Sequence, residues 1–451
     1  MPQLKSKTVY LCSACGNDHP KWHGQCPSCN EWGTLGEFKV SKKRKKGSGG
    51  LARDSRKLSD ILQGEEVKRI PTGIAEMDRV LGGGLLPGSL ILLGGNPGIG
   101  KSTLALQILP AFTKPVLYVS AEESEEQIGL RARRLNVNSD SLHLSSENRI
   151  EGILDQISLI QSELVVIDSI QTVFSDALDS LPGSVSQIRE CGQQLLQLAK
   201  QRNIAVIIIG HVTKEGVIAG PKMLEHMVDV VLYIEGDDRH DHRILRSAKN
   251  RFGTSNEVGI FQMESNGLIE VKNPSELFLA ERRDDISGST IFPSLEGSRP
   301  ILVEVQALVS NANFGTPQRN VNGFDFKRLA MLLAVLEKRL GILMGTKDVF
   351  VNLVGGLKID DPAADLAVIT AVASSARDKL LPKSVILIGE VGLGGEVRSV
   401  SRLDTRINEA KSLGFKSVIA PTANVKRIKT QPKGIKISGV ANVGEAFHLL
   451  F

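Results

Sequence analysis

The chain has 451 residues, of which 41% are apolar and 23% charged, with 55 basic and 50 acidic side chains. This composition is typical of a globular protein with two or three domains and excludes a disordered or collagen-like chain. No apolar run reaches the ~20 residues needed to span a membrane, and the N-terminus lacks an apolar segment. We therefore expect neither a membrane span nor a secretory signal, and a cytoplasmic location. The net charge of +5 is too small to establish a polyanionic partner.

Four of the five cysteines lie near the N-terminus as two Cys-x2-Cys pairs, Cys12 with Cys15 and Cys26 with Cys29. Each pair directs two thiolates at one point, and four thiolates at about 2.3 Å suit tetrahedral Zn2+. A segment this small cannot form an adequate core, so metal binding would supply its folding free energy. Two disulfides are the alternative, which a reducing compartment disfavours. We predict a structural zinc site in a domain over residues 1–38. His19 and His23 lie between the two pairs and could replace a cysteine as ligand, but we expect them to face solvent because four sulfurs already complete the shell.

Two α/β domains are predicted to follow, at 57–273 and 274–451, after a basic and glycine-rich linker at 39–56. The linker contains five consecutive cations, so contact with nucleic acid is an alternative to a plain spacer. In the first domain, apolar strands alternate with amphipathic helices, which is typical of a mostly parallel sheet covered on both faces. The strands are expected at 90–94, 116–120, 164–168, 204–210 and 230–235, and the helices at 101–109, 125–135, 150–160 and 185–201. In the second domain, strands are expected at 301–309, 349–353, 384–389 and 417–420, and helices at 365–379 and 403–413.

A phosphate-binding loop connects the first of these strands to the first helix. Its residues are Gly95, Asn96, Pro97, Gly98, Ile99, Gly100, Lys101, Ser102 and Thr103. Glycines let backbone N–H groups approach phosphates without an intervening Cβ, Lys101 would reach the β- and γ-phosphates, and Ser102 would help to hold Mg2+. We therefore predict that the chain binds and hydrolyses ATP.

Polar residues at the ends of three other strands complete the predicted nucleotide site. Asp168 ends an apolar strand, where it could hold the magnesium ion through water. Glu122 is the candidate base for the attacking water, Glu123 is the second choice, and we expect their strand to lie next to the phosphate loop. His211 could sense the γ-phosphate, with a purely structural histidine as the alternative.

Basic residues beyond these strands are candidates for contact with DNA. Lys214 and Lys222 lie in the segment after His211, which contains glycines. The segment Lys249-Asn250-Arg251-Phe252-Gly253 follows a strand expected over 244–247, and two cations two residues apart on a strand point to the same side. We predict a role for Lys249 and Arg251 in nucleotide or DNA coupling, with a solvated basic edge or simple phosphate contacts to DNA as the alternatives.

The order of these motifs resembles the RecA/DnaB class of P-loop ATPases and not the GTPases, since no Asn-Lys-x-Asp motif follows. The zinc segment, the phosphate loop, residues 118–124 and the Lys-Asn-Arg-Phe-Gly segment resemble, over essentially the whole chain, the RadA (Sms) family of bacterial DNA-repair proteins. This resemblance implies a homo-oligomeric ring, a hexamer, in which Lys249 and Arg251 reach the γ-phosphate of the neighbouring subunit. It also implies branch migration of recombination intermediates and a partnership with the recombinase RecA.

From about residue 276 the chain resembles the proteolytic domain of Lon. Ala363 stands where Lon has its nucleophilic serine, and Asp404 stands opposite the usual lysine, or Arg398 or Arg402 in a shifted alignment. A methyl group cannot attack a carbonyl and a guanidinium cannot act as a general base, so we expect no peptidase activity. We expect this domain to set the oligomer's geometry and to offer a basic surface, with the candidates Lys327, Arg328, Lys338, Arg339 and Lys347.

The sequence therefore predicts a RecA-like ATPase core between a zinc ribbon and a Lon-like α/β domain. We expect a DNA-dependent ATPase of repair and recombination, a ring-shaped motor on single-stranded or branched DNA. Its cofactors would be ATP, Mg2+ and Zn2+. Two other functions stay open at this point: an ATP-driven regulator of a recombinase or replication protein that does not move along DNA, and an ATP-gated peptidase.

Overall fold

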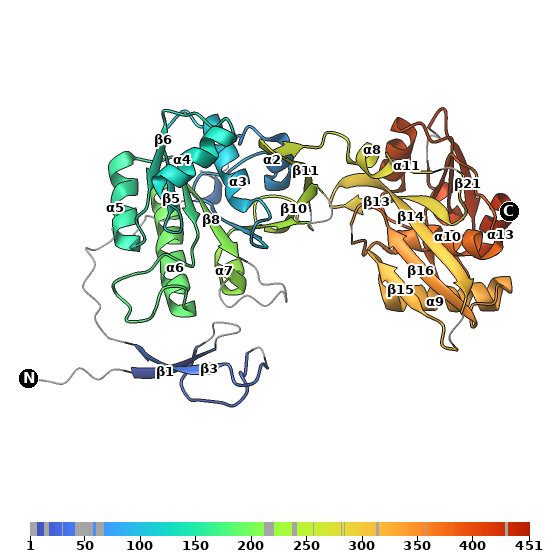
Figure 1. Cartoon of the computed structure of the whole chain (residues 1–451), viewed down its shortest axis with the longest axis horizontal. Helices are drawn as coiled ribbons and strands as arrows, with labels where there is room; N and C mark the ends of the chain where they lie inside the picture. The colour runs from blue at the N-terminus through green and yellow to red at the C-terminus, as the bar shows by residue number, and fades with distance from the viewer. Residues whose placement is uncertain are drawn as a thin grey trace, which may run out of the picture. The chain divides into compact units, whose positions relative to one another are not determined.

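The computed structural model describes residues 7–12, 18–28, 30–40, 57–59, 67–211, 221–236, 241–255, 257–280, 282–283, 285–312, 315–356, 358–428 and 432–451. The chain divides into two compact units, which are described separately (Figure 1). The first comprises Met1–Gly236 and Asp241–Glu270, and the second comprises Asp237–His240 and Val271–Phe451.

The N-terminal segment forms a small antiparallel sheet in the order β2-β1-β3. Its strands are β1 (Lys7–Cys12), β2 (Asp18–His19) and β3 (Leu35–Val40). Cys12, Cys26 and Leu35 form its buried cluster, against which Tyr10 packs. So small an apolar cluster is too little to hold a domain of this size together, so a further source of stability is needed.

A nine-stranded sheet, in the order β12-β11-β10-β9-β4-β8-β7-β5-β6, forms the centre of the first unit. Strands β4 to β9 run parallel, and β10 to β12 extend the sheet antiparallel beyond β9. The strands are β4 (Leu90–Gly95), β5 (Val116–Ser120), β6 (Leu142–Ser145), β7 (Leu164–Asp168), β8 (Ala205–His211), β9 (Val230–Glu235), β10 (His242–Asn250), β11 (Val258–Glu264) and β12 (Gly267–Glu270).

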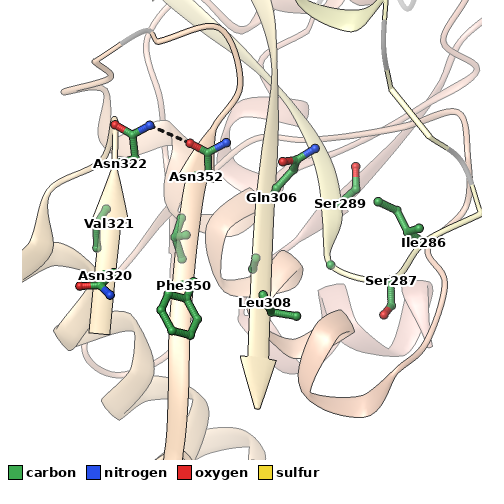
Figure 2. Close-up of a pocket in the computed structure, with 13 residues that line it drawn as sticks. Ile286, Ser287, Ser289, Gln306, Leu308, Asn320, Val321, Asn322, Phe350 and Asn352 are labelled. Atoms are coloured by element: carbon green, nitrogen blue, oxygen red, sulfur yellow. Dashed lines mark hydrogen bonds between the residues drawn. The ribbon is translucent and has the colours of Figure 1, made fainter. Parts of the chain in front are cut away.

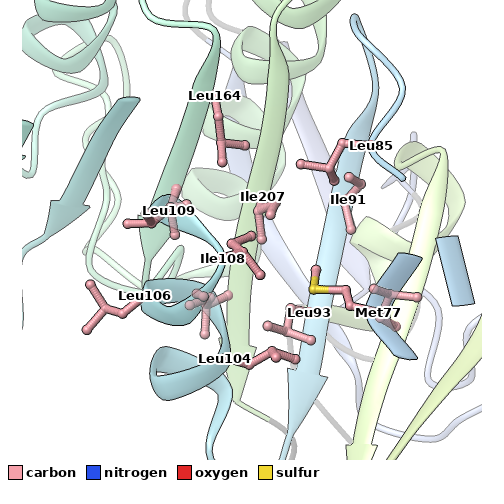
Figure 3. Close-up of a cluster of buried hydrophobic side chains, with 14 of the residues drawn as sticks. Met77, Leu85, Ile91, Leu93, Leu104, Leu106, Ile108, Leu109, Leu164 and Ile207 are labelled. Carbon is pink, nitrogen blue, oxygen red and sulfur yellow. The ribbon is translucent and has the colours of Figure 1, made fainter. Parts of the chain in front are cut away.

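Helices cover both faces of this sheet, which explains why its central strands are apolar on both sides. Leu90 and Leu92 of β4 point into one core cluster, and Ile91 and Leu93 point into the other, where Leu104 packs against them (Figure 3). The helices are α2 (Ala75–Leu81), α3 (Lys101–Gln107), η1 (Leu109–Ala111), α4 (Glu125–Arg134), α5 (Ile150–Ile160), α6 (Val185–Arg202) and α7 (Pro221–Met227).

The register of the sheet defines two opposite edges. At the carboxyl edge of the parallel strands, Gly95 pairs with His211 on β8 and with Ile234 on β9. At the amino edge, Val230 pairs with Ile91 on β4 and with Asn250 on β10. The phosphate loop therefore leaves the carboxyl edge, and the end of β10 lies at the amino edge.

The second unit contains a seven-stranded mixed sheet in the order β15-β16-β14-β13-β17-β20-β21, and α10 packs against β13 and β14. The strands of the whole second unit are β13 (Ser289–Glu296), β14 (Arg299–Asn311), β15 (Arg319–Asn322), β16 (Lys347–Leu353), β17 (Val385–Leu387), β18 (Glu390–Val391), β19 (Val397–Arg398), β20 (Ser417–Pro421) and β21 (Lys436–Val440). Its helices are α8 (Pro274–Leu279), α9 (Phe326–Leu340), η2 (Pro362–Ala364), α10 (Asp365–Arg377), α11 (Leu403–Ser412), α12 (Thr422–Val425) and α13 (Val443–Leu450).

The strands and helices predicted between residues 90 and 235 all form, with ends within two residues of the prediction. Neither α9 nor the antiparallel extension through β11 and β12 was predicted. Within the described part of the chain, no helix is long and apolar enough to cross a membrane.

Candidate nucleotide site and neighbouring centres

The phosphate loop joins β4 to α3 and depends on glycine at both ends. Gly95 has φ +153°, and a Cβ there would lie 2.8 Å from the carbonyl oxygen of Ile234. Gly100 has φ +113°, and its Cβ would lie 2.9 Å from Cε of Met263. Any other residue at Gly95 would combine backbone strain with a clash against a backbone oxygen, whereas at Gly100 the positive φ alone favours glycine, because the methionine side chain can move.

Lys101 extends from the start of α3 back over the loop. Its Nζ donates hydrogen bonds to the carbonyl oxygens of Gly95 and Asn96, both at 2.9 Å. Burial lowers the pKa of Lys101, while the negative charges of Asp168 and Glu122 oppose that shift. These two carboxylates are therefore close enough to act on the ammonium group, so the structure brings three of the predicted site residues together.

Asp168 ends β7 and is held by a tyrosine that the sequence analysis missed. Tyr118 of β5 donates a hydrogen bond from its hydroxyl to Asp168 Oδ2 at 2.6 Å. Asp168 is 7% exposed and Tyr118 is wholly buried, and burial together with this carboxylate raises the pKa of Tyr118 well above its ordinary value. The period of two in a strand puts Tyr118 on the same face as Ser120. The pairing of Ser120 with Asp168 comes from the strand register, which the sequence does not give.

Glu122 follows the end of β5, where its carboxylate accepts a hydrogen bond from Ser169 Oγ at 2.5 Å. The expectation that this strand lies next to the phosphate loop was wrong, because β8 and β7 separate β5 from β4. Glu122 instead approaches the site through Ser169, the residue after Asp168. Glu123 forms an ion pair with Arg131 of α4, which makes it the weaker candidate for a base.

Three further residues predicted for nucleotide or DNA contact are described only partly or not at all. His211 ends β8 and pairs with Gly95, so its backbone adjoins the loop, but its side chain is not described. Lys214 lies outside the described residues. Lys222 is in α7, and its side chain is likewise not described.

The Lys-Asn-Arg-Phe-Gly segment lies at the amino edge and differs from the expectation of two cations on one strand face. A β-bulge separates Ser247 from Lys249, and β10 ends at Asn250, before Arg251. Lys249 Nζ donates hydrogen bonds to the carbonyl oxygens of Glu225 at 2.6 Å and Val228 at 2.8 Å, at the C-terminal end of α7. Burial and then the charge of nearby Arg251 lower the pKa of Lys249.

Arg251 is the more accessible of the two cations. Its side chain is 56% exposed, and its Nη1 lies 3.7 Å from Oδ1 of the buried Asp229. The backbone N–H of Asp229 donates to the carbonyl oxygen of Leu90, the first residue of β4. Arg251 therefore lies at the Leu90 end of β4. Leu90 is five residues from Gly95 along the strand, roughly 16 Å at the rise of a strand. Arg251 is at the opposite edge of the sheet from its own phosphate loop.

The described part of the N-terminal segment fits the predicted zinc centre. Cys12 and Cys26 are both 0% exposed and belong to one buried cluster, while Cys15 and Cys29 lie outside the described residues. Two buried thiols brought together from a strand and a turn match one half of a four-cysteine site. His23 is exposed as expected, but His19 is half-buried with Nε2 3.5 Å from Cys26 Sγ, so its orientation toward solvent was predicted wrongly.

The second unit holds buried ion pairs around the place of the Lon nucleophile. Ala363 is 2% exposed. Arg406 of α11, which is 1% exposed, donates from Nη2 to Asp361 Oδ2 at 2.6 Å and from Nη1 to the carbonyl oxygen of Pro293. A fixed guanidinium paired with a carboxylate is a structural element and offers no base to a nucleophile.

Arg328 was a candidate for a basic surface, and its contacts give it a different role. Its guanidinium forms an ion pair with the buried Asp365 at the start of α10 and lies 3.4 Å from Glu390. Asp365 also accepts a hydrogen bond from the backbone N–H of Val391 at 2.9 Å. This positive charge is neutralised within the unit, so Arg328 is unsuited to binding DNA phosphates.

One cavity of about 590 Å³ lies on the open face of the β13, β14, β16 and β15 sheet (Figure 2). Ser289, Gln306, Asn352 and Asn322 form one row across the four strands, and the last two are joined by a hydrogen bond of 2.8 Å. The 13 residues that line the cavity include no lysine, histidine or carboxylate. The cavity therefore contains no nucleophile–base pair of the kind that peptidases use.

Comparison with known proteins agrees with this division of the chain. Residues 10–37 match the family described as rubredoxin metal binding domain, residues 56–217 that described as AAA domain, and residues 343–448 that described as Lon protease (S16) C-terminal proteolytic domain. The solved structure of the RadB recombinase aligns with 45% of this chain and 100% of its own, at 25% identity and a TM-score of 0.37, a likeness too weak to carry an argument. The predicted fold class is confirmed: a RecA-like α/β ATPase core with an N-terminal zinc ribbon and a C-terminal Lon-type domain.

Two curated relatives match over nearly their full length, and both are called DNA repair protein RadA. The protein of Listeria monocytogenes serovar 1/2a is 48% identical over 99% of this chain and 98% of its own length. The protein of Bacillus subtilis (strain 168) is 50% identical over 98% of each chain. Identity of this size along the whole chain shows that it belongs to the family of the DNA repair protein RadA, ATPases of DNA repair and recombination.

Proposed function

We propose that the chain is a DNA-dependent ATPase that forms a homo-oligomeric ring, a hexamer, and moves along single-stranded or branched DNA to drive branch migration. The observation that carries this proposal is the position of Arg251. An exposed guanidinium roughly 16 Å along the sheet from its own phosphate loop is suited to the γ-phosphate held by a neighbouring subunit. Hydrolysis then depends on assembly, because each catalytic site needs residues from two subunits.

In this proposal the carboxyl edge of each sheet holds ATP and orients the attacking water. Lys101 binds the β- and γ-phosphate oxygens, and Ser102 and Asp168 hold Mg2+, which balances the charge of the phosphates when bound. The hydrogen bond from Tyr118 fixes the Asp168 carboxylate for this task. Glu122, held by Ser169, takes the proton of the water, and Arg251 of the neighbour stabilises the transition-state charge.

The zinc ribbon has a structural role in this proposal. Cys12, Cys15, Cys26 and Cys29 would hold one Zn2+ ion, and four thiolate ligands would leave no position for a catalytic water. The buried pair of Cys12 and Cys26 supports this assignment. Metal binding would supply the folding free energy that the small apolar cluster cannot.

DNA would contact the segment that leads from His211 into α7. Lys214 and Lys222 supply its phosphate contacts, so affinity should fall steeply with salt and depend weakly on sequence. We also propose a partnership with the recombinase RecA, which the family resemblance implies, and a cytoplasmic location, where DNA is accessible. We take residues 1–38, 39–56, 57–273 and 274–451 as zinc ribbon, linker, ATPase domain and Lon-like domain.

We further propose that the Lon-like domain is not proteolytic and serves assembly. Alanine occupies the nucleophile's place, and the buried pair of Arg406 and Asp361 occupies the space beside it. Casein cleavage that is abolished by Lys101→Ala and insensitive to DNA would contradict this proposal.

The central test combines kinetics with imaging. ATP turnover is measured with and without single-stranded DNA, and particles formed with an ATP analogue and DNA are examined by electron microscopy. We expect DNA to stimulate turnover and rings to enclose DNA. Turnover that responds to a protein partner but not to DNA would favour a regulator that does not translocate.

A further inference from the structure

The turn that carries Glu122 is fixed on both sides of that residue. Before it, Ser120 ends β5, and its Oγ accepts a hydrogen bond from the backbone N–H of Glu123 at 3.3 Å. After it, Ser124 caps α4. Its Oγ accepts from the backbone N–H of Gln127 at 3.4 Å, and Gln127 Oε1 accepts from the backbone N–H of Ser124 at 2.9 Å. This capping box and the bond to Ser120 fix the backbone of the turn.

The side chain of Glu123 is held by a residue about two helical turns further along α4. Arg131 forms an ion pair with it through one nitrogen, Nη2, and one oxygen, Oε1. The side chains of Arg131 and Glu123 are 23% and 31% exposed, so water screens this pair less than it screens a pair on the open surface. Glu123 is the residue next to Glu122, so the ion pair restrains the turn directly beside the predicted base.

The contact between the two side chains involves one atom of each. Arg131 Nη1 and Glu123 Oε2 are both buried, and neither has a hydrogen-bond partner within the described part of the chain. Pairs of arginine with a carboxylate often use two nitrogens and both oxygens, which fixes their geometry as well as their charge. An arginine that engages through one nitrogen acts mainly as a positive charge, and lysine can also supply such a charge.

The ion pair also lies close to the polar centre of the nucleotide site. Burial and the charge of Asp168 raise the pKa of Tyr118, and the charges of Arg131 and Glu123 act on the same hydroxyl in opposite directions. This hydroxyl is the one that donates to Asp168. The ion pair on α4 is therefore within electrostatic range of the contact that holds the candidate magnesium ligand.

We propose that Arg131 is a positioning residue for ATP hydrolysis, because its ion pair with Glu123 holds the turn in the place where the carboxylate of Glu122 meets the attacking water. This proposal rests on the proposed function, in which Glu122 takes the proton of that water. Glu123 then supports the turn as the acceptor for Arg131 and takes no proton itself. A misplaced base slows hydrolysis but leaves the affinity for ATP intact, since the phosphate loop makes the phosphate contacts.

Neutral variants at the two acidic positions separate the base from its support. Glu122→Gln should lower kcat at least about a hundredfold. Glu123→Gln keeps an oxygen that can accept from Arg131, so its kcat should stay within about threefold of the wild type. A loss in Glu123→Gln that equals or exceeds the loss in Glu122→Gln would overturn the proposal. Little loss in either variant would instead contradict the role of Glu122, and so the proposed function on which the proposal rests.

Arginine variants on α4 test the ion pair itself. Arg131→Met should lower kcat about tenfold and leave the Kd for ATP within about twofold. Arg131→Lys should recover most of the rate, because the contact uses a single nitrogen. Arg133→Met is the matched control, since Arg133 lies on the same helix with its side chain exposed. Unchanged kcat in Arg131→Met, an equal loss in Arg133→Met, or no recovery in Arg131→Lys would overturn the proposal.

A double variant separates the positioning of Glu122 from a general effect on the fold. When Glu122→Gln has already removed the carboxylate, Arg131→Met should lower the rate less than about twofold further. A residue that only stabilises the fold would lower the rate about tenfold in both backgrounds, and that result would overturn the proposal. Single-turnover hydrolysis of radiolabelled ATP by the full-length protein, with Mg2+ and single-stranded DNA, measures these rates.

Discussion

The hydroxyl of Tyr118 lies 2.6 Å from Asp168 Oδ2, and both side chains are buried between two parallel strands. A buried carboxylate that keeps one neutral donor stays oriented without losing its charge to an ion pair. Tyr118 therefore fixes the orientation of the Asp168 carboxylate, which would hold Mg2+ in the proposed site.

Tyr118→Phe should lower kcat about tenfold and raise the Mg2+ concentration for half-maximal turnover, because Asp168 loses one charge-assisted hydrogen bond. Tyr233→Phe is the matched control, since it removes a tyrosine–carboxylate bond of the same length elsewhere in the unit. ATP turnover titrated with Mg2+ checks the prediction. A Mg2+ dependence identical to the wild type would contradict it.

The lowered pKa of Lys101 predicts that ATP binding takes up a proton when the pH is close to or above that pKa. In the free protein, burial puts this pKa below its ordinary value of 10.5, whereas bound phosphates would raise it. Affinity should therefore fall as pH rises through the lowered pKa, earlier than an ordinary lysine would allow. Calorimetry in two buffers of different ionisation enthalpy measures the uptake. Lys101→Arg, whose guanidinium stays protonated, should show none.

Arg251→Ala should leave the Kd for ATP within about twofold and lower DNA-stimulated kcat about a thousandfold, the size expected for a cation supplied in trans. Arg246→Ala is the control, because Arg246 lies on β10, the strand that ends just before Arg251, and its Nε is 3.3 Å from Oε1 of Glu235. Nucleotide binding is followed by fluorescence polarisation and turnover by phosphate release. Loss of ATP binding itself in Arg251→Ala would show that the role in trans is wrong.

The zinc ribbon should contain one equivalent of zinc in protein purified under reducing conditions. Both tryptophans of the chain, Trp22 and Trp32, lie in this segment and are 60% and 74% exposed. Removal of the metal should therefore lower the anisotropy of tryptophan emission, since the ribbon loses its source of folding free energy. Less than about half an equivalent by metal analysis would contradict a four-cysteine site.

Arg406→Met should lower the free energy of unfolding of the Lon-like unit by about 3–5 kcal/mol, because it leaves Asp361 without its buried partner. Arg398→Met should change it by less than about 1 kcal/mol, since the pair of Arg398 with Glu396 is largely exposed. Urea titration followed by circular dichroism checks both values. Equal effects would show that the buried pair is not a structural element.

The parallel core could be predicted well because its signals are local. Apolar strands such as 164–168, a glycine loop and amphipathic helices each occupy one short stretch, and the βαβ rule arranges them. α9 was missed although it also carries local signals, an Asp325 cap and an amphipathic pattern. The antiparallel extension through β11 and β12 carries no comparable signal.

The site was predicted only where it depends on one segment. Lys101 and Asp168 follow from their own motifs, but Tyr118 and Ser169 matter because strand register brings them to Asp168 and Glu122. Residue spacing predicts neither the strand order β4-β8-β7-β5 nor the bulge before Lys249. Long-range register is set by packing, so a single sequence leaves it undetermined.

All six residues of β4 are buried, and each end of the strand lies beside a residue that the proposed function assigns to nucleotide, Lys101 at one end and Arg251 at the other. Leu90 is bonded to Asp229, the carboxylate beside Arg251, and Gly95 accepts a hydrogen bond from Lys101. A strand packed on both faces moves as one rigid piece. If Arg251 binds phosphate in the next subunit, release of that phosphate would change the forces at one end of β4 and so the affinity for ATP at the other end. In the proposed ring, this mechanical connection would give the subunits a physical reason to hydrolyse ATP one after another.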